Sequence, residues 1–288
     1  MPAPLIGLVA HTGKAGALAM AARLRDEFLR RGAEVRIETR TAEMMDEKEG
    51  LSIRELSEAC EIIVALGGDG TILQVVHEMH ECLRPIFGIN LGSLGFLTCV
   101  SSSAVEQAVE CIVNRLYTKT QRILLEMEVL RGDSLVERRI GLNDVVISRG
   151  SVSRLIRLHT WIDGAALTEY NADGLVISTP TGSTAYSLAA GGPILTPDCG
   201  VFAVTPICPH VLTNRSLIFS DNSTLAVSPC EHQGEINVTV DGQQSTSISS
   251  GDIVQIRKAK QCVSLAMLPG VSFFEVLRQK LKWSGTAI

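Results

Sequence analysis

The sequence predicts an α/β domain followed by a β-rich domain. Over roughly the first 100 residues, short apolar runs alternate with amphipathic segments, a pattern typical of βαβ units and a parallel sheet. After that, β-branched runs separated by turn residues dominate. We therefore predict a Rossmann-like α/β domain over residues 1–100, completed by a returning C-terminal helix within about 268–288, and an all-β domain of the β-sandwich type over 101–267.

The predicted elements of the α/β domain follow from apolar spacing. Leu5–Ala10 is a short apolar strand, and Ala15–Arg31 carries apolar residues at helical spacing and ends at Gly32. The remaining elements, in chain order, are a strand at Glu34–Thr39, a helix at Ile53–Cys60, a strand at Glu61–Leu66, a helix from Thr71 and a strand at Pro85–Asn90.

The second domain is predicted to begin with a helix at Ser103–Leu116 and to continue as strands. Asp163-Gly164 and Asp241-Gly242 are dipeptides that favour hairpin turns. A final helix at Phe273–Trp283 is expected to pack on the first domain, which makes that domain discontinuous in sequence. The predicted strands are Arg122–Leu130, Arg139–Ser148, Leu155–Ile162, Gly174–Thr179, Ser216–Phe219, Ile236–Val240, Ile253–Arg257 and Val263–Met267.

Composition narrows the function classes. The net charge of −5 and the lack of any long basic segment argue against a nucleic-acid or anionic membrane surface. No apolar run reaches the ~20 residues that span a bilayer, and the N-terminus has no basic leader. The 8 cysteines are scattered without a CxxC pair, so we expect reduced thiols in a cytoplasmic protein. His77 and His80 have helical spacing, but no further zinc ligand lies nearby in sequence, so we interpret them as surface histidines.

The most informative motif is the turn after the apolar run Glu61–Leu66. The turn consists of Gly67, Gly68, Asp69, Gly70 and Thr71. Glycines before a helix let a phosphate approach bare backbone N–H groups, and the helix N-terminus adds a favourable dipole. Asp69 would repel that phosphate unless it binds a metal or accepts a proton. The motif therefore indicates a phosphoryl-transfer site rather than a passive phosphate cradle.

Two further segments carry candidate site residues. Gly88–Phe96 again places glycines directly after a strand, which suggests one crevice lined by both glycine-rich turns. In Asn171–Pro193, a strand lies between an acid and a dense run of small hydroxyl residues. Such hydroxyls suit ribose and phosphate oxygens, and Tyr186 could stack on a base. Asn143-Asp144 taken alone is more often a simple turn.

Together these segments resemble the NAD kinase family. The first motif is shared with lipid kinases and phosphofructokinases of the same GGDGT superfamily, whereas the long run that begins at Asp173 is far more specific. The matching segments occur in the order of the family and span most of the chain: Gly67–Thr71, Gly88–Phe96, Leu142–Asp144, Asp173–Pro193, Pro206–Leu212 with Pro209-His210, and Asp241–Gln243.

The resemblance implies a role for each matching position. Asp69 is the implied general base, which takes the proton from the 2′-hydroxyl of the adenosine ribose of NAD as that oxygen attacks the γ-phosphate of ATP. An ordinary carboxylate, with a pKa of about 4, is a weak base, but orientation matters more than basicity in a loose phosphoryl-transfer transition state. Mg²⁺ or another divalent cation is the implied cofactor, with no protein metal ligand assigned. The implied nucleotide-binding residues are Gly67, Gly68, Gly70, Thr71, Asn143, Asp144, Arg154, Asn171, Asp173, Thr181, Thr184, Ala185, Tyr186, Ser187, Leu188, Ala189 and Gln243.

The chain departs from the family pattern at Asn171, where many members carry a basic residue, which leaves the preference between NAD and NADH open. Lys14 could reach a phosphate or be an ordinary loop lysine. Two other functions compete: a lipid kinase of the diacylglycerol type, and a non-catalytic NAD(P)-binding regulator. The family also implies a homodimer or homotetramer. The sequence leaves open whether ATP or polyphosphate is the phosphoryl donor. It also leaves open whether NADP(H) regulates the activity by feedback.

Overall fold

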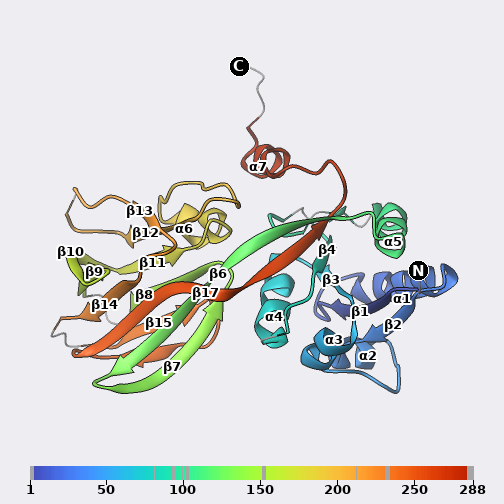
Figure 1. The fold of residues 1–288 in the computed structure, drawn as a ribbon, viewed down its shortest axis with the longest axis horizontal. Helices are drawn as coiled ribbons and strands as arrows, with labels where there is room; N and C mark the ends of the chain where they lie inside the picture. Colours follow the sequence, from blue (N-terminus) through green and yellow to red (C-terminus); the bar gives the residue numbers. More distant parts are fainter. Residues whose placement is uncertain are drawn as a thin grey trace. The chain divides into compact units, whose positions relative to one another are not determined.

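The computed structural model describes residues 3–80, 82–92, 95–98, 100–101, 104–150, 154–211, 213–230 and 234–283. The chain forms two compact units (Figure 1): unit 1 comprises Met1–Gln121 and Val263–Ile288, and unit 2 comprises Arg122–Cys262. This division differs from the predicted boundaries at residues 100 and 268. Helix α5 (Val105–Val113) belongs to unit 1 because its buried side chains share a core with helix α1 (Ala17–Arg30).

Unit 1 is built on a parallel sheet in the order β2-β1-β3-β4. Every residue of β3 (Ile62–Gly67) is buried, as its continuous apolar run requires in a sheet covered on both faces. The flanking strands are β1 (Leu5–Ala10), β2 (Glu34–Ile37) and β4 (Ile86–Asn90), and β4 also pairs with the short β5 (Val100–Ser101) and with Leu265-Ala266 at the end of β17 (Asp252–Met267).

Helices cover the two faces of this sheet. On one face, Ile6 and Leu8 share a buried core with Leu24 and Phe28 of α1 and with α5. On the other face, a Cβ at Gly7 would approach Leu56 of α3 (Ile53–Ala59). A Cβ at Gly88 would lie 2.7 Å from Ile72 of α4 (Asp69–Met79), so β4 and α4 approach closely. The predicted α/β class of this domain is confirmed.

Two local predictions in unit 1 are wrong. Helix α4 begins at Asp69 and not at Thr71, so the carboxylate lies in the first turn of the helix. The predicted strand at Glu34–Thr39 ends at Ile37, and a short helix, α2 (Thr39–Met44), follows. The Glu38 side chain caps α2 by accepting from the N–H groups of Arg40 and Thr41, a cap that few sequence rules anticipate.

The C-terminal helix α7 (Phe273–Leu281) is grouped with unit 1, as the predicted discontinuous domain requires. Ser272 and Glu275 form a capping box at its start. Lys280 Nζ lies 5.9 Å from the ring centroid of Phe96, a residue of the loop after β4.

Unit 2 is a sandwich of antiparallel strands. One sheet has the order β13-β12-β11-β8-β15-β16, and the other contains β10-β9-β14-β17, with β6 pairing to β17 and to β7. The strands are β6 (Thr118–Arg131), β7 (Ser134–Gly141), β8 (Asp144–Arg149), β9 (Ile156–Ile162), β10 (Ala165–Ala172), β11 (Gly174–Ser178), β12 (Val201–Ile207), β13 (Leu217–Ser220), β14 (Leu225–Pro229), β15 (Ile236–Val240), β16 (Thr246–Ile248) and β17.

One buried cluster joins the two sheets of unit 2. Met127 of β6 and Leu158 of β9 contribute from one sheet, and Ile147 of β8 and Ile177 of β11 contribute from the other. The β-sandwich prediction is therefore confirmed for this domain. The same region holds short helical turns, η2 (Gly182–Thr184) and α6 (Tyr186–Ala189), within the hydroxyl-rich segment.

Strand boundaries in unit 2 correct the sequence predictions at two places. The predicted strand Arg139–Ser148 is broken at Leu142-Asn143, where β7 ends and β8 begins. The two strands predicted at Ile253–Arg257 and Val263–Met267 form the single strand β17. No helix among the described residues is long and apolar enough to cross a membrane.

Candidate functional site

The glycine-rich turn of unit 1 lies at the carboxyl edge of the parallel sheet. Backbone pairing continues past the strands, because the His11 N–H donates to Leu66 O at 2.8 Å and the Leu91 N–H donates to Gly67 O at 3.0 Å. Three strand ends therefore converge at this edge, where ligands of open parallel sheets bind. A Cβ at Gly68 would lie 2.9 Å from Lys14 Nζ, so this lysine extends along the turn.

Backbone amides of the loop after β4 hold the Asp69 carboxylate. The Phe96 N–H donates to Oδ2 at 2.8 Å, and the Leu97 N–H donates to Oδ1 at 3.1 Å. The loop is tied by Thr98 Oγ1, which accepts from Asn90 Nδ2 and from the Gly95 N–H, each at 2.9 Å. Asp69 is half-buried, and its charge is favoured at the first turn of α4. The side chain thus has a fixed direction.

Two glycines of this site have no room for a side chain. A Cβ at Gly95 would overlap Asp69 Oδ1 and would lie 2.7 Å from Thr98 Oγ1. A Cβ at Gly67 would overlap Thr71 Oγ1, the atom that accepts from the Gly68 N–H at 3.3 Å. Gly70 differs, because nothing lies within 4 Å of its Cβ position and it is exposed. Gly95 and Gly67 serve packing within the site, whereas Gly70 leaves open space in front of the backbone.

Unit 2 contains a cavity of about 340 Å³ beside the start of β8. It brings together Asn143 and Asp144 with Ala185 and Tyr186, four of the predicted site residues. Tyr186 is 45% exposed, and its aromatic side chain can contact a ligand in this cavity. The remaining lining residues are Val146, Thr239, Asp241 and Gly242.

Asp241 organises the floor of this cavity. Its carboxylate accepts three consecutive backbone N–H groups, from Leu142 at 2.8 Å, from Asn143 at 2.8 Å and from Asp144 at 3.0 Å. The Asp241 N–H in turn donates to Asp144 O at 2.9 Å. The turn backbone has φ of 50° at Asp241 and 68° at Gly242, as a hairpin turn requires. This side chain therefore fixes the β7–β8 junction that carries Asn143 and Asp144.

Asp144 is buried beside that carboxylate. Burial and, to a smaller extent, the negative charge of Asp241 together raise the pKa of Asp144 from 3.8 to about 7. Near neutral pH the Asp144 carboxyl therefore exchanges between a hydrogen-bond donor and an anion. A group of this kind suits recognition of ribose hydroxyls, which both donate and accept.

Most small hydroxyls of the hydroxyl-rich segment form hydrogen bonds with other protein groups, and two buried ones do not. Thr179 Oγ1 donates to Leu142 O at 2.6 Å, and Ser183 Oγ donates to Pro180 O at 2.7 Å. Ser187 Oγ lies 3.3 Å from Thr205 Oγ1, and Thr184 Oγ1 donates to Thr181 O at 3.2 Å. These hydroxyls shape the segment, while the buried Ser178 Oγ and Thr181 Oγ1 have no hydrogen-bond partner among the described residues.

The remaining predicted residues do not line the cavity. Asp173 Oδ1 accepts from Arg149 Nε at 2.7 Å, beside the start of β11. Asn171 lies on β10, and its carbonyl accepts from the His210 N–H at 2.9 Å. Gln243 is exposed in the turn after β15, and Arg154 is exposed before β9. Leu188 and Ala189, on α6, are half-buried and exposed respectively.

Two segments that together cover most of the sequence match a known family. Residues 6–117 match the ATP-NAD kinase N-terminal domain, and residues 142–268 match the ATP-NAD kinase C-terminal domain. The NAD kinase of Ruminiclostridium cellulolyticum is 38% identical over 279 residues, which cover 96% of this chain and 97% of the relative. The NAD kinase of Syntrophotalea carbinolica is 41% identical, with 88% and 89% covered. The chain belongs to the NAD kinase family, a family of phosphotransferases.

Solved structures with the same fold extend this comparison. Yeast NADH kinase complexed with NADH matches with a TM-score of 0.91 and 24% identity, covering 100% of this chain and 90% of that chain. An NAD kinase from Archaeoglobus fulgidus in complex with ATP matches with a TM-score of 0.76 and 23% identity, covering 98% and 100%. The architecture of an α/β domain plus a β-sandwich is therefore shared with members of the NAD kinase family.

Sequence reasoning missed several parts of these two sites. Asp241 was recognised only as part of a turn and of a family motif, and Thr239 was not singled out. The amides of Phe96 and Leu97 carry no sequence signal, because any residue other than proline supplies a backbone N–H. For Lys14 the sequence allows two interpretations, and the structure places its ammonium beside Gly68.

Proposed function

We propose that this chain catalyses Mg²⁺-dependent transfer of the γ-phosphate of ATP to the 2′-hydroxyl of the adenosine ribose of NAD, giving NADP. Membership of the NAD kinase family supports the reaction class. One observation supports the assignment of Asp69 as the catalytic base. Its carboxylate lies at the N-terminus of α4 and is held there by the backbone N–H groups of Phe96 and Leu97. Taken separately, unit 1 carries the proposed base and phosphate-binding turn, and unit 2 carries the proposed nucleotide cavity.

Asp69 acts as the general base. Each carboxylate oxygen that accepts one backbone N–H keeps a second lone pair, which can accept the ribose proton. The proton leaves the 2′-hydroxyl as its oxygen forms a bond to the γ-phosphorus, and the bond from that phosphorus to the bridging oxygen of ADP breaks. Because the transition state of such transfers is loose, a correctly directed carboxylate contributes chiefly by orientation.

The glycine turn and Lys14 bind the phosphates of ATP. The open space at Gly70 lets a phosphate oxygen reach the backbone, and the N-terminus of α4 favours negative charge there. The Lys14 ammonium beside Gly68 supplies a point charge for the same group. Polyphosphate offers the same anionic chemistry, so an assay with each donor decides between the two.

Magnesium enters this scheme with the substrate. Mg²⁺ is commonly held by substrate phosphates and one or two carboxylates, and Asp69 is the carboxylate at this turn. A site formed by substrate phosphates and one protein carboxylate fits a metal ion that arrives bound to ATP. When bound, Mg²⁺ neutralises charge that develops on the phosphates. The protein residues do the rest: they orient the phosphates and accept the proton.

The cavity of unit 2 binds the nucleotide. The Tyr186 ring offers a stacking surface for a base, and Asn143 with Asp144 offers donors and acceptors for ribose hydroxyls. The unpaired Thr181 Oγ1 is a further hydroxyl available to a ligand in this segment.

We also propose that the protein is a cytoplasmic homo-oligomer, in line with the free thiols of its described cysteines and with the family resemblance. Light scattering on the purified chain measures the subunit number.

The decisive assay uses purified protein, NAD, ATP and Mg²⁺, with NADP measured by coupling to an NADP-specific dehydrogenase. We expect NADP to accumulate. Asp69→Asn should lower kcat by at least ~100-fold while NAD binding, measured by calorimetry, stays close to wild type. Near wild-type turnover in Asp69→Asn would remove Asp69 from the base role. Phosphorylation of diacylglycerol in place of NAD would overturn the proposed substrate, and NAD binding without turnover would favour a non-catalytic regulator.

A further inference from the structure

We infer that His159, Glu169 and Cys230 form a zinc-binding site on the surface of unit 2. One ligand atom from each of the three residues lies within 4.8 Å of the other two. His159 Nε2 is 2.7 Å from Glu169 Oε2, and Cys230 Sγ is 3.9 Å from the same oxygen. The three residues lie outside the cavity and outside the glycine turn, so this inference does not depend on the proposed kinase reaction.

The sheet places the three side chains on one face. His159 on β9 is directly opposite Glu169 on β10 and opposite Ser228 on β14. Cys230 follows Ser228 by two positions, so it shares that face because side chains alternate along a strand. The Cys230 N–H donates to Arg157 O at 2.9 Å, which continues the strand pairing to this residue. The ligands therefore come from adjacent, hydrogen-bonded backbone segments.

The present distances are close to those of a metal site. Zinc binds nitrogen and oxygen at about 2.0–2.2 Å and sulfur at about 2.3 Å, so neighbouring ligands of a tetrahedral site are about 3.3–3.7 Å apart. The 2.7 Å gap between His159 and Glu169 has to widen, and the 3.9 Å gap between Cys230 and Glu169 has to narrow slightly. Rotation of exposed side chains supplies movements of this size. A water molecule completes the fourth position.

The donor set selects the metal. A thiolate, an imidazole and a carboxylate match zinc, whereas Mg²⁺ and Ca²⁺ prefer oxygen ligands alone. The charges of the Glu169 carboxylate and the Cys230 thiolate balance that of Zn²⁺. Burial and the neighbouring Glu169 raise the pKa of the Cys230 thiol, so metal binding forms a Zn–S bond and releases the thiol proton to the buffer.

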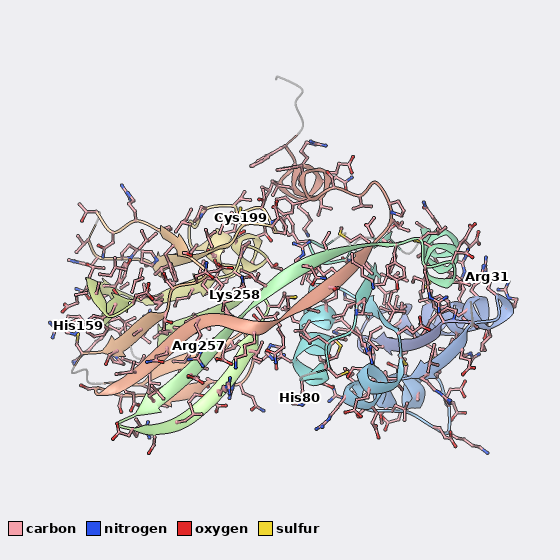
Figure 2. All side chains as sticks on the ribbon, viewed as in Figure 1. Arg31, His80, His159, Cys199, Arg257 and Lys258 are labelled. Carbon is pink, nitrogen blue, oxygen red and sulfur yellow. The ribbon has the colours of Figure 1, made fainter. Side chains whose placement is uncertain are left out.

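Neighbouring side chains support two of the ligands. The ring centroids of His159 (Figure 2) and Trp161 are 5.8 Å apart in an edge-to-face contact, which restricts the imidazole. Arg157 Nη1 lies 3.7 Å from Glu169 Oε1, so it faces the carboxylate oxygen that is not shared with His159 and Cys230. Its positive charge opposes a cation, but an exposed pair of this kind contributes little. A bound zinc ion would join β9, β10 and the end of β14 at this edge.

The test measures Zn²⁺ binding by the full chain under a phosphine reductant, in competition with a chromophoric chelator. The background variant Cys208→Ser/Cys262→Ser removes the exposed cysteines among the described residues. We expect one Zn²⁺ per chain, with affinity lowered at least ~10-fold by Cys230→Ser and by His159→Gln. His80→Gln is the matched control, because His80 is an exposed histidine of unit 1 (Figure 2), and it should leave the affinity unchanged.

Cobalt gives an independent readout of the thiolate. Co²⁺ bound at this site should show a sulfur-to-cobalt charge-transfer band that disappears in Cys230→Ser and persists in His80→Gln. Excess Mg²⁺ should not displace Co²⁺. Zinc should also raise the midpoint of thermal unfolding of the wild type but not of Cys230→Ser.

The absence of stoichiometric binding, or equal affinity in wild type, Cys230→Ser and His159→Gln, would overturn the site. Circular dichroism monitors the fold of each variant. Should Cys230→Ser be unfolded, Glu169→Gln decides, since it replaces a single exposed carboxylate oxygen: retained affinity in that variant counts against the site, and weakened affinity supports it.

Discussion

The two units each use an aspartate to hold a distant loop, but they use it differently. In unit 1, the half-buried Asp69 carboxylate accepts hydrogen bonds from the N–H groups of Phe96 and Leu97. In unit 2, Asp241 takes three N–H groups and so fixes Asn143 and its neighbour Asp144. The first carboxylate is held in place while free lone pairs remain for chemistry. The second carboxylate commits three of its lone pairs to backbone N–H groups, and in the proposed function it is the neighbouring Asp144 that meets the ligand.

The largest expected effect comes from disrupting the hydrogen bonds that orient the Asp69 carboxylate. In Gly95→Ala the new Cβ would overlap Asp69 Oδ1, so the carboxylate has to turn away. We expect kcat to fall by about 100-fold with a small change in the KM for NAD, because the base is misdirected while the cavity of unit 2 is untouched. Gly92→Ala is the matched control in the same loop, since its Cβ would meet only Asn90 Oδ1, at 3.8 Å. Equal loss in both variants would point to general loop damage.

The next expected effect concerns the backbone hydrogen bonds that the Asp241 carboxylate accepts. In Asp241→Asn an amide group replaces one acceptor oxygen, so at least one of the N–H groups of Leu142, Asn143 and Asp144 loses its partner. A buried unpaired N–H costs about 1–3 kcal/mol of folding free energy. We expect a lower midpoint of urea unfolding and a KM for NAD about 10-fold higher. A urea titration followed by circular dichroism gives the midpoint, and steady-state kinetics gives the KM.

Asp163→Asn is the matched control for that variant. Asp163 occupies the other Asp-Gly turn, with φ of 51°, and its Oδ1 accepts a single N–H, from Thr224 at 2.8 Å. This turn does not line the cavity. An unchanged KM for NAD in Asp163→Asn, against a raised KM in Asp241→Asn, would assign the effect to the cavity rather than to turns of this type.

A smaller effect concerns the exposed ring of the cavity. Tyr186→Ala removes the stacking surface, and we expect NAD affinity to fall by about 10-fold, as for one base stacked on one ring. Tyr186→Phe keeps the ring and should stay within about 2-fold of wild type. Similar losses in the two variants would indicate that the hydroxyl, and not stacking, contributes the affinity.

The last expected effect concerns stability rather than catalysis, namely the pH dependence contributed by Asp144. Its pKa is raised from 3.8 in the unfolded chain to about 7 in the fold, so between these values the folded protein keeps a proton that the unfolded chain has lost. Its contribution to stability is therefore full below about pH 4, declines as the pH rises towards 7 and levels off above. Urea unfolding at about pH 5 and about pH 8 should show a smaller difference in Asp144→Asn than in wild type. The same difference in both proteins would assign the slope to other groups.

Local patterns predicted much of the fold, because hydrophobic spacing is a property of neighbouring residues. The strands Leu5–Ala10 and Ile236–Val240 have the predicted bounds. The helix at Thr39–Met44 was missed, since its threonines favour a strand and its cap is a glutamate. The break at Leu142-Asn143 was missed because it depends on Asp241, nearly 100 residues away.

The same distinction holds for the sites. Gly67–Thr71 is contiguous, so the motif could be recognised directly in the sequence. The partners of Asp69 are backbone groups 27 and 28 residues further along, and no residue type marks them. The dense hydroxyls are expected to contact the nucleotide, yet Ser183 Oγ is hydrogen-bonded to backbone groups of the protein, Pro180 O and the Leu195 N–H. The amino-acid composition of a segment predicts that it can form hydrogen bonds, but it does not predict which groups are the partners.

The chain enters unit 2 after Gln121 and returns to unit 1 at Val263. Gln121 Nε2 donates to Ser264 Oγ at 2.8 Å, and Thr120 Oγ1 donates to Leu265 O at 3.4 Å, so the exit and the return are neighbours on paired strands. Unit 2 is thus an insertion into a hairpin of unit 1. A tight turn in its place would close unit 1 into a continuous chain that keeps the whole glycine turn.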